Sequence, residues 1–439
     1  MEVIVAKGDT NSRSSLLGSP HGGITSLTAC LFVVGEMTGA ALLAMPQAIK
    51  STGLYLGPFL MILTCIASAY GGVILSKCWL LLESADSSLK QITTRDPFSL
   101  IGEKACGKVG SFATVMSLIV TLFGAGVVQI LVCSEMLESL IPVKISFCQW
   151  TIIVGFSLLP LSFFGSPVDF PLVAFFAMSS TSIAAVLILI SLLTQGVIGS
   201  DSVADSRPLS GIGRSLMSVM LGLSSMFYSF SGTSCMPTIQ NDMKNKKSFK
   251  VAIMCAYTVM IAIYLPISVV GYYKAGDLVQ SNIVRNLKPS VLTTIIEVLM
   301  TAHVLCAYLI LMNPVNLNIE TFTGMRHSMN TWRCLSRTLV TLLAIFIAQT
   351  VPKFGKLLPI IGASATLIQT FILPSLFYYR LSTSYAHLSR VEVVPLILLT
   401  VIGVVGAIFG TYSAVSDLLS PYALTLPCYL TASCSACPP

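Results

Sequence analysis

The feature that most constrains this chain is a series of long apolar runs, each long enough to span a lipid bilayer as a helix. A spanning helix needs about 20 mostly apolar residues. Charged residues or Pro/Gly clusters separate runs of this kind at residues 25–49, 53–82, 111–141, 148–165, 170–195, 213–237, 250–273, 289–317, 333–351, 355–379 and 391–416. The pattern predicts an all-α integral membrane protein with about eleven transmembrane helices.

The composition argues against a water-soluble fold. Of 439 residues, 54% are hydrophobic and only 10% are charged, whereas an ordinary globular domain has about 25% charged residues. The formal net charge of +7 would suggest an acidic partner in a soluble protein. Here the placement of basic residues around the apolar runs matters more, so we expect a lipid bilayer and no nucleic acid as partner.

The distribution of basic residues predicts the orientation and three parts. With a cytoplasmic N-terminus, most of the 25 Lys and Arg residues lie on the cytoplasmic side, as is typical of membrane proteins. Residues 1–24 are then a polar cytoplasmic tail, residues 25–416 the transmembrane domain, and residues 417–439 a non-cytoplasmic tail. The sequence leaves open the role of Cys428, Cys434 and Cys437 in that tail, and whether this multi-pass protein lies in the plasma membrane or an endolysosomal or vesicular membrane.

Two of the runs are interrupted by polar and helix-breaking residues. The first run contains Gly35, Gly39 and Pro46, and the sixth contains Ser229, Ser231, Gly232, Thr233 and Pro237. Two interrupted helices five positions apart indicate an inverted-repeat transporter with its substrate at the breaks, because membranes tolerate bare peptide groups only where they line a cavity. A close helix contact is the alternative role of the first-run glycines.

Around these breaks the chain resembles the amino acid/auxin permease family. Residues 39–53, GAALLAMPQAIKSTG, are similar to its Gly-x-Gly-x-Leu-x-x-Pro-x-Ala signature, with Ala41 for the second Gly. Residues 227–250 are similar to its Phe-x-Phe-x-Gly-His region, with Thr233 for His. Residues 271–287, 302–320 and 358–380 resemble further family segments in the same order. The resemblance implies a five-plus-five inverted-repeat fold with broken helices 1 and 6 plus one extra C-terminal helix, and amino acid transport by alternating access coupled to protons or sodium.

The breaks offer both kinds of group that bind an amino acid zwitterion. The N–H groups of Gly39, Ala40 and Ala41 lie at the positive end of the second half-helix, where we expect the substrate carboxylate. Carbonyl groups near Tyr228, Ser229 and Phe230 are expected to accept hydrogen bonds from the ammonium group. The side chains of Tyr228 and Phe230 either shape the substrate pocket or pack between helices. Ser231 and Gly232 complete the predicted substrate-binding set.

Glu36, three residues before the first break, is the main candidate for ion coupling. A charge at mid-span costs on the order of 3 kcal/mol, and intramembrane acids mark ion pathways. We interpret Glu36 as a proton carrier, with a permanently protonated hydrogen-bonding group or a sodium ligand as alternatives. His303 is a second titratable candidate, although it also fits a neutral core histidine. The hydroxyl of Thr301 is a candidate sodium ligand.

These residues favour a secondary active amino acid transporter, with protons preferred to sodium as the coupling ion and no cofactor or metal. An enzyme is not expected, because the helices contain no paired carboxylates, metal-ligand run or nucleophile motif. The alternatives are a receptor-like membrane protein that senses an amino acid with little flux, and a sodium-coupled transporter. The expected partners are a small-molecule amino acid and the bilayer. The amino acid, the direction of transport and the oligomeric state stay open.

Overall fold

The computed structural model describes residues 23–86, 89, 96–163, 171–198, 215–325, 330–386, 389–420 and 426–431. Across these ranges the chain is helical, and its only β-pairing consists of two isolated bridges. The long helices are α3 (Leu56–Ala85), α4 (Pro97–Leu140), α6 (Pro171–Thr194), α10 (Phe249–Ala275), α11 (Val291–Phe322), α12 (Thr331–Thr350) and α15 (Arg390–Leu419). The shorter ones are α1 (Ser26–Met37), α2 (Ala40–Thr52), α5 (Phe147–Ser162), α8 (Leu216–Ser229), α9 (Met236–Asn241), α13 (Phe354–Ile361), α14 (Leu373–Tyr385) and α16 (Cys428–Thr431).

The helices confirm the predicted all-α membrane class. Eight helical segments of the described chain are long and apolar enough to cross a membrane, and α1 with α2 forms a ninth span bent by 61°. The shorter apolar helices α5 and α8 coincide with parts of the fourth and sixth predicted runs. Many large apolar side chains point outward, including Val401, Ile408 and Phe409 of α15. An outward apolar surface of this kind suits contact with lipid.

Some helices begin or end away from the predicted limits. Helix α4 begins at Pro97, because Asp96 caps it by accepting a hydrogen bond from the Ser99 N–H (3.2 Å) and proline is favourable in the first turn. Non-helical angles at Cys106 and Gly107 kink α4, and the part after this kink begins close to the predicted limit at residue 111. Helix α15 continues to Leu419, past the predicted boundary at residue 417. Asp417 in its last turn is paired with Lys356 at 2.5 Å, which stabilises the extra turn.

The tenth predicted run is one span with an irregular middle. Helices α13 and α14 are joined by two π-helical segments, Gly362–Thr366 and Ile368–Ile372. A Cβ atom on Gly362 would lie 2.0 Å from the carbonyl oxygen of Ser224 in α8. Only glycine permits this close approach. The first π-helical segment therefore begins where the chain contacts the backbone of α8, in the interrupted sixth span.

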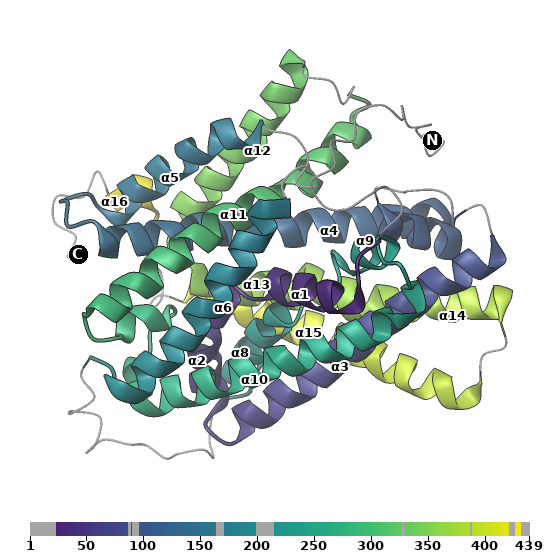
Figure 1. The fold of residues 1–439 in the computed structure, drawn as a ribbon, viewed down its shortest axis with the longest axis horizontal. Helices are drawn as coiled ribbons and strands as arrows, with labels where there is room; N and C mark the ends of the chain where they lie inside the picture. The colour runs from purple at the N-terminus through teal and green to yellow at the C-terminus, as the bar shows by residue number, and fades with distance from the viewer. Residues whose placement is uncertain are drawn as a thin grey trace.

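The two interrupted spans lie in the centre of the bundle. Figure 1 shows α1 near the middle, and α1 packs against α6 and α10 while α2 packs against α8 and α10. Helix α11 packs extensively against α4 and α6 on the other side. The surrounding long helices therefore enclose both breaks.

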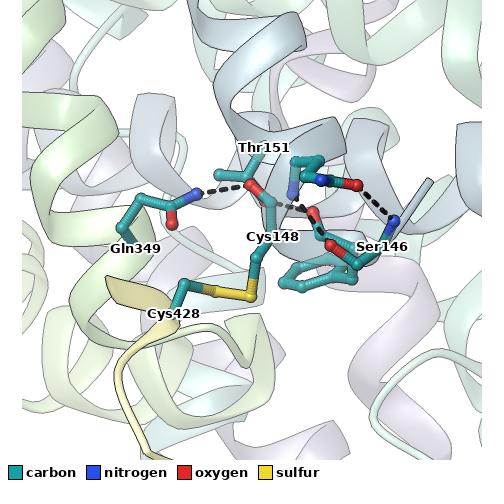
Figure 2. Close-up of a disulfide and its surroundings, with 7 residues drawn as sticks. Ser146, Cys148, Thr151, Gln349 and Cys428 are labelled. Atoms are coloured by element: carbon teal, nitrogen blue, oxygen red, sulfur yellow. Dashed lines mark hydrogen bonds between the residues drawn. A yellow bond between two sulfur atoms is a disulfide. The ribbon is translucent and has the colours of Figure 1, made fainter. Parts of the chain in front are cut away.

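A disulfide fixes the last described segment to the bundle. Cys148 at the start of α5 is bonded to Cys428 in α16, as Figure 2 shows. The Gln349 side chain of α12 donates to the carbonyl oxygen of Cys148 at 2.8 Å, and Tyr429 stacks on Phe346 of α12. Part of the predicted tail is thus ordered against α5 and α12. Cys434, Cys437 and residues 1–22 of the predicted N-terminal tail lie outside the described residues.

A buried ionic cluster joins α11, α12 and α5 at the opposite end of the bundle. Glu320 is fully buried and accepts hydrogen bonds from Nε of Arg333 (3.0 Å) and Nε of Arg337 (2.7 Å). Arg337 also donates to the carbonyl oxygen of Ser162 at 2.6 Å. Removing one partner of such a cluster leaves a buried charge without compensation.

We predict that Glu320→Gln destabilises the protein by about 3 kcal/mol, since two arginines lose their counter-charge. Glu392→Gln is the matched control, because the Lys77–Glu392 pair is exposed and 3.8 Å long, and such pairs contribute about 1 kcal/mol or less. The apparent melting temperature of the detergent-solubilised variants measures both effects. Equal melting temperatures for the two variants would contradict the structural role of Glu320.

Candidate functional site

Both breaks open onto one small cavity of about 50 Å³. Residues 36–41 line one side of it, and the rest of the lining is Thr121, Leu122, Ala125, Gln129, Tyr228, Ser231, Ser234 and Leu311. The first predicted break therefore faces the sixth-span break across a shared space. Gly232 brings the two breaks into direct contact, since a Cβ atom there would lie 2.8 Å from Sδ of Met37.

The first break presents bare backbone N–H groups to the cavity. Thr38 is extended and Gly39 has φ of +149°, a conformation that favours glycine. In this structure no described group accepts a hydrogen bond from the N–H of Gly39, Ala40 or Ala41. These groups lie at the start of α2, where the helix dipole adds partial positive charge. The arrangement is suited to a carboxylate or another small anion.

The carbonyl groups next to the breaks are partly engaged by α10. Tyr264 donates its hydroxyl to the carbonyl oxygen of Met37 (2.7 Å), and Tyr257 donates to that of Phe230 (2.9 Å). The Ser231 hydroxyl donates to the carbonyl oxygen of Tyr228 at 2.6 Å. A carbonyl oxygen has two lone pairs, so those of Met37 and Phe230 each keep one acceptor position. The carbonyl oxygen of Tyr228 also accepts from the Ser231 N–H at 3.2 Å and is fully used.

The predicted substrate-binding residues divide into two sets. Gly39, Ala40, Ala41, Tyr228 and Ser231 line the cavity, whereas Ser229, Phe230 and Gly232 do not. The Phe230 ring is fully buried, with centroids 6.3 Å from Tyr257 and 5.6 Å from Tyr264. Phe230 therefore supports the break from behind.

Glu36 is the one predicted ion-coupling residue that lines the cavity. It lies in the last turn of α1 and is half-buried. None of the described residues donates a hydrogen bond to its carboxylate or forms an ion pair with it. The lining residues include no Lys, Arg or His. An ionised Glu36 would thus have no compensating charge in the cavity.

His303 lies directly behind the first break. Its Nδ1 is 2.9 Å from the carbonyl oxygen of Ala177 and also contacts the Thr181 hydroxyl, which assigns the ring proton to Nδ1. Its Nε2 is buried, has no partner among the residues described, and lies 2.6 Å from the position that a Cβ atom on Gly39 would take. His303 therefore supports the backbone of the break.

Thr301, the predicted sodium ligand, lies outside the lining of the cavity at the breaks. Its hydroxyl donates to the carbonyl oxygen of Glu297, one turn back in its own helix, at 2.8 Å. Thr301 is buried and does not line the cavity.

Sequence reasoning missed the contribution of α4. Thr121, Ala125 and Gln129 lie four residues apart, which places them on one helix face, and all three line the cavity. Oγ1 of Thr121 and Oε1 of Gln129 are buried and have no hydrogen-bond partner in the described part of the chain. Their spacing within an apolar run was the available signal, because polar residues in spanning helices face the bundle interior.

The family model described as transmembrane amino acid transporter protein matches residues 22–416. The chain belongs to the transmembrane amino acid transporter family. Among curated relatives from Arabidopsis thaliana, amino acid transporter AVT1C is 24% identical over 402 residues, covering 89% of this chain and 69% of the relative. Amino acid transporter AVT1E is 26% identical over 402 residues, covering 88% and 72%. These relatives are transporters and not enzymes.

Solved structures show that the fold is also a transporter fold. A manganese transporter mutant from Eremococcus coleocola superposes with a TM-score of 0.54 and 13% identity, covering 93% of this chain and 90% of that one. A Na+-coupled sialic acid symporter gives a TM-score of 0.54 and 11% identity, covering 91% of each chain. At this identity the likeness concerns the fold alone. The family membership supports transport of a small-molecule amino acid across a membrane.

We predict that Gly39→Ala abolishes most amino acid uptake. The added Cβ atom meets Nε2 of His303 at 2.6 Å, and the backbone conformation costs about 1–3 kcal/mol for a non-glycine residue. Gly53→Ala is the matched control, because Gly53 has φ of +93° but open space around its Cβ position. Uptake into vesicles, normalised to folded protein, measures the effect. Normal uptake by Gly39→Ala would show that transport does not need this backbone shape.

Proposed function

We propose that this protein is a secondary active transporter that moves an amino acid by alternating access and couples the movement to protons through Glu36. One observation carries the proposal: the N–H groups of Gly39–Ala41 and the carboxylate of Glu36, none of which has a partner among the described residues, line the same cavity. The N–H groups are suited to the substrate carboxylate. Glu36 and the remaining carbonyl lone pairs are suited to the ammonium group.

The size of the cavity supports a small substrate. A volume of about 50 Å³ corresponds to a few water molecules, at about 10–15 Å³ of such volume for each. A space of that size favours a substrate with a small side chain. We therefore propose that this conformation fits a small neutral amino acid at the breaks, with Tyr228 limiting the side chain.

The surroundings of Glu36 support protons over sodium as the coupling ion. An isolated carboxylate in a membrane cavity is costly, and protonation removes that cost without any further ligand. A sodium ion prefers several oxygen ligands. The predicted hydroxyl ligand Thr301 does not line the cavity and donates its hydrogen to Glu297.

The disulfide supports the proposed orientation in the membrane. Disulfides persist in oxidising compartments such as the cell exterior and organelle lumens. The Cys148–Cys428 bond lies at the end of the bundle where α5 begins. We therefore propose that this end is non-cytoplasmic and that the N-terminus is cytoplasmic.

We predict that Glu36→Gln removes the pH dependence of transport, because a glutamine cannot bind and release the coupled proton. In proteoliposomes, an inward proton gradient should raise uptake of L-alanine or another accepted amino acid by the unaltered protein but not by the variant. Exchange of internal for external amino acid should persist. Glu392→Gln is the matched control, because the Glu392 side chain is 42% exposed and lies in the first turn of α15, away from the cavity lining.

The same vesicles separate the alternatives. Gradient-driven uptake by Glu36→Gln at matched protein amounts would remove Glu36 from the coupling role. Accumulation that requires sodium and is insensitive to pH would replace the proton with sodium. Saturable binding without accumulation in the unaltered protein would favour a receptor-like function.

We predict that protease added to vesicles with their cytoplasmic face outward removes an N-terminal epitope tag and spares a C-terminal one. The expectation follows from the disulfide, which requires an oxidising compartment for Cys428. Immunoblotting for both tags measures it, and detergent-permeabilised vesicles, in which both tags are cut, are the control. Loss of the C-terminal tag alone would contradict the proposed orientation and indicate the opposite one.

A further inference from the structure

A second and larger cavity lies apart from the breaks, near the end of the bundle that carries the disulfide. Its volume is about 340 Å³, within the range of about 300–1,000 Å³ that is usual for small-molecule sites. It is formed by the end of α4, the segment between α10 and α11, and the first turns of α11. Its polar lining includes Ser139, Gln280, Arg285, Ser290, Thr294 and Glu297. It shares no lining residue with the cavity at the breaks.

Glu297 lines this cavity with a carboxylate of which only one oxygen accepts a hydrogen bond from the described protein. The residue is buried, and Oε1 accepts one hydrogen bond, from the Ser139 hydroxyl at 2.6 Å. In the described part of the chain no donor reaches Oε2, which is not enclosed by protein. A buried carboxylate with a single hydroxyl partner is unfavourable unless a cation or further donors complete it. Oε2 is therefore open to the cavity, where it can accept hydrogen bonds from a ligand.

Arg285 supplies the opposite charge to the same cavity. It lies in the 3-10 turn Ile283–Asn286, and one terminal nitrogen pairs with Glu138 of α4. Its other guanidinium N–H groups have no acceptor among the described residues. The spare donors have the planar arrangement that binds a carboxylate.

Hydrogen bonds hold the segment that carries Arg285 in place. Asn282 donates to the buried carboxylate of Glu135 in α4 at 3.0 Å and accepts from the Val284 N–H at 3.1 Å. Asn286 donates to the carbonyl oxygen of Leu278 at 3.0 Å. Arg285 is thus positioned before any ligand arrives, which lowers the entropic cost of binding.

We propose that this outer cavity binds an amino acid as a zwitterion, with its ammonium group at Glu297 and its carboxylate at Arg285. The inference rests on the proposed function for its choice of ligand class. Two separate groups of opposite charge, each with an unused face on one cavity, match the two charges of a zwitterion. A single anion would leave Glu297 unpaired, and a single cation would leave the spare donors of Arg285 unused. The site offers the amino acid a binding place outside the breaks, on the proposed non-cytoplasmic side.

The test measures binding when the cavity at the breaks is disabled. Purified full-length Gly39→Ala protein is incubated with each of the common L-amino acids in radiolabelled form, and bound label is counted by scintillation proximity. We expect saturable binding of at least one amino acid. Adding Glu297→Gln or Arg285→Gln should weaken that binding about tenfold or more, since each leaves one charge of the ligand unpaired. Adding Glu392→Gln should leave it unchanged.

The outcomes separate this site from the proposed function. Loss of all binding in Gly39→Ala, or equal binding after Glu297→Gln and Arg285→Gln, overturns the outer site even if the unaltered protein still transports amino acids. Binding of sodium with no amino acid overturns it as well. Should Gly39→Ala fail to fold, the unaltered protein must show two saturable components, of which Arg285→Gln removes one. A single component that Arg285→Gln leaves intact overturns the inference.

Discussion

The structure depends on how peptide groups are satisfied where two helices are interrupted inside an apolar environment. Lipid offers no hydrogen bonds, so each bare group needs a protein partner or a cavity. Helix α10 supplies two of these partners. The Tyr264 hydroxyl donates to the carbonyl oxygen of Met37 at the first break, and the Tyr257 hydroxyl donates to that of Phe230 at the sixth-span break. Among the described residues, the N–H groups of Gly39–Ala41 and the nearby carboxylate of Glu36 have no partner. The proposed binding and transport of an amino acid depend on these N–H groups and on this carboxylate.

The same reasoning links the two cavities. At the breaks, partial positive charge comes from backbone N–H groups and negative charge from Glu36. In the outer cavity, side chains take both roles, through Arg285 and Glu297. By contrast, the buried charge of Glu320 is compensated by Arg333 and Arg337. Incomplete pairing therefore distinguishes the proposed binding regions from the buried ionic cluster that joins α11, α12 and α5.

The sequence predicted what apolar periodicity and helix breakers encode: the helical membrane class, the runs, and the breaks near Gly39 and Gly232. It could not predict which residues face the cavity, because that depends on the rotation of each helix against its neighbours. Phe230 and Tyr228 were indistinguishable by sequence, yet only Tyr228 lines the cavity. Thr121 and Gln129 lie far from both breaks in the chain. The Cys148–Cys428 bond joins residues 280 positions apart, and only the tertiary fold brings them together.

The central claim is that the bare N–H groups at the start of α2 hold the carboxylate of an amino acid. An experimental density map of the full-length protein with its transported amino acid bound tests this most directly. The account predicts the substrate carboxylate within about 2.7–3.2 Å of the backbone nitrogens of Gly39–Ala41, with its ammonium group toward Glu36. An amino acid bound elsewhere, with α1 and α2 rejoined as one continuous helix, would contradict it.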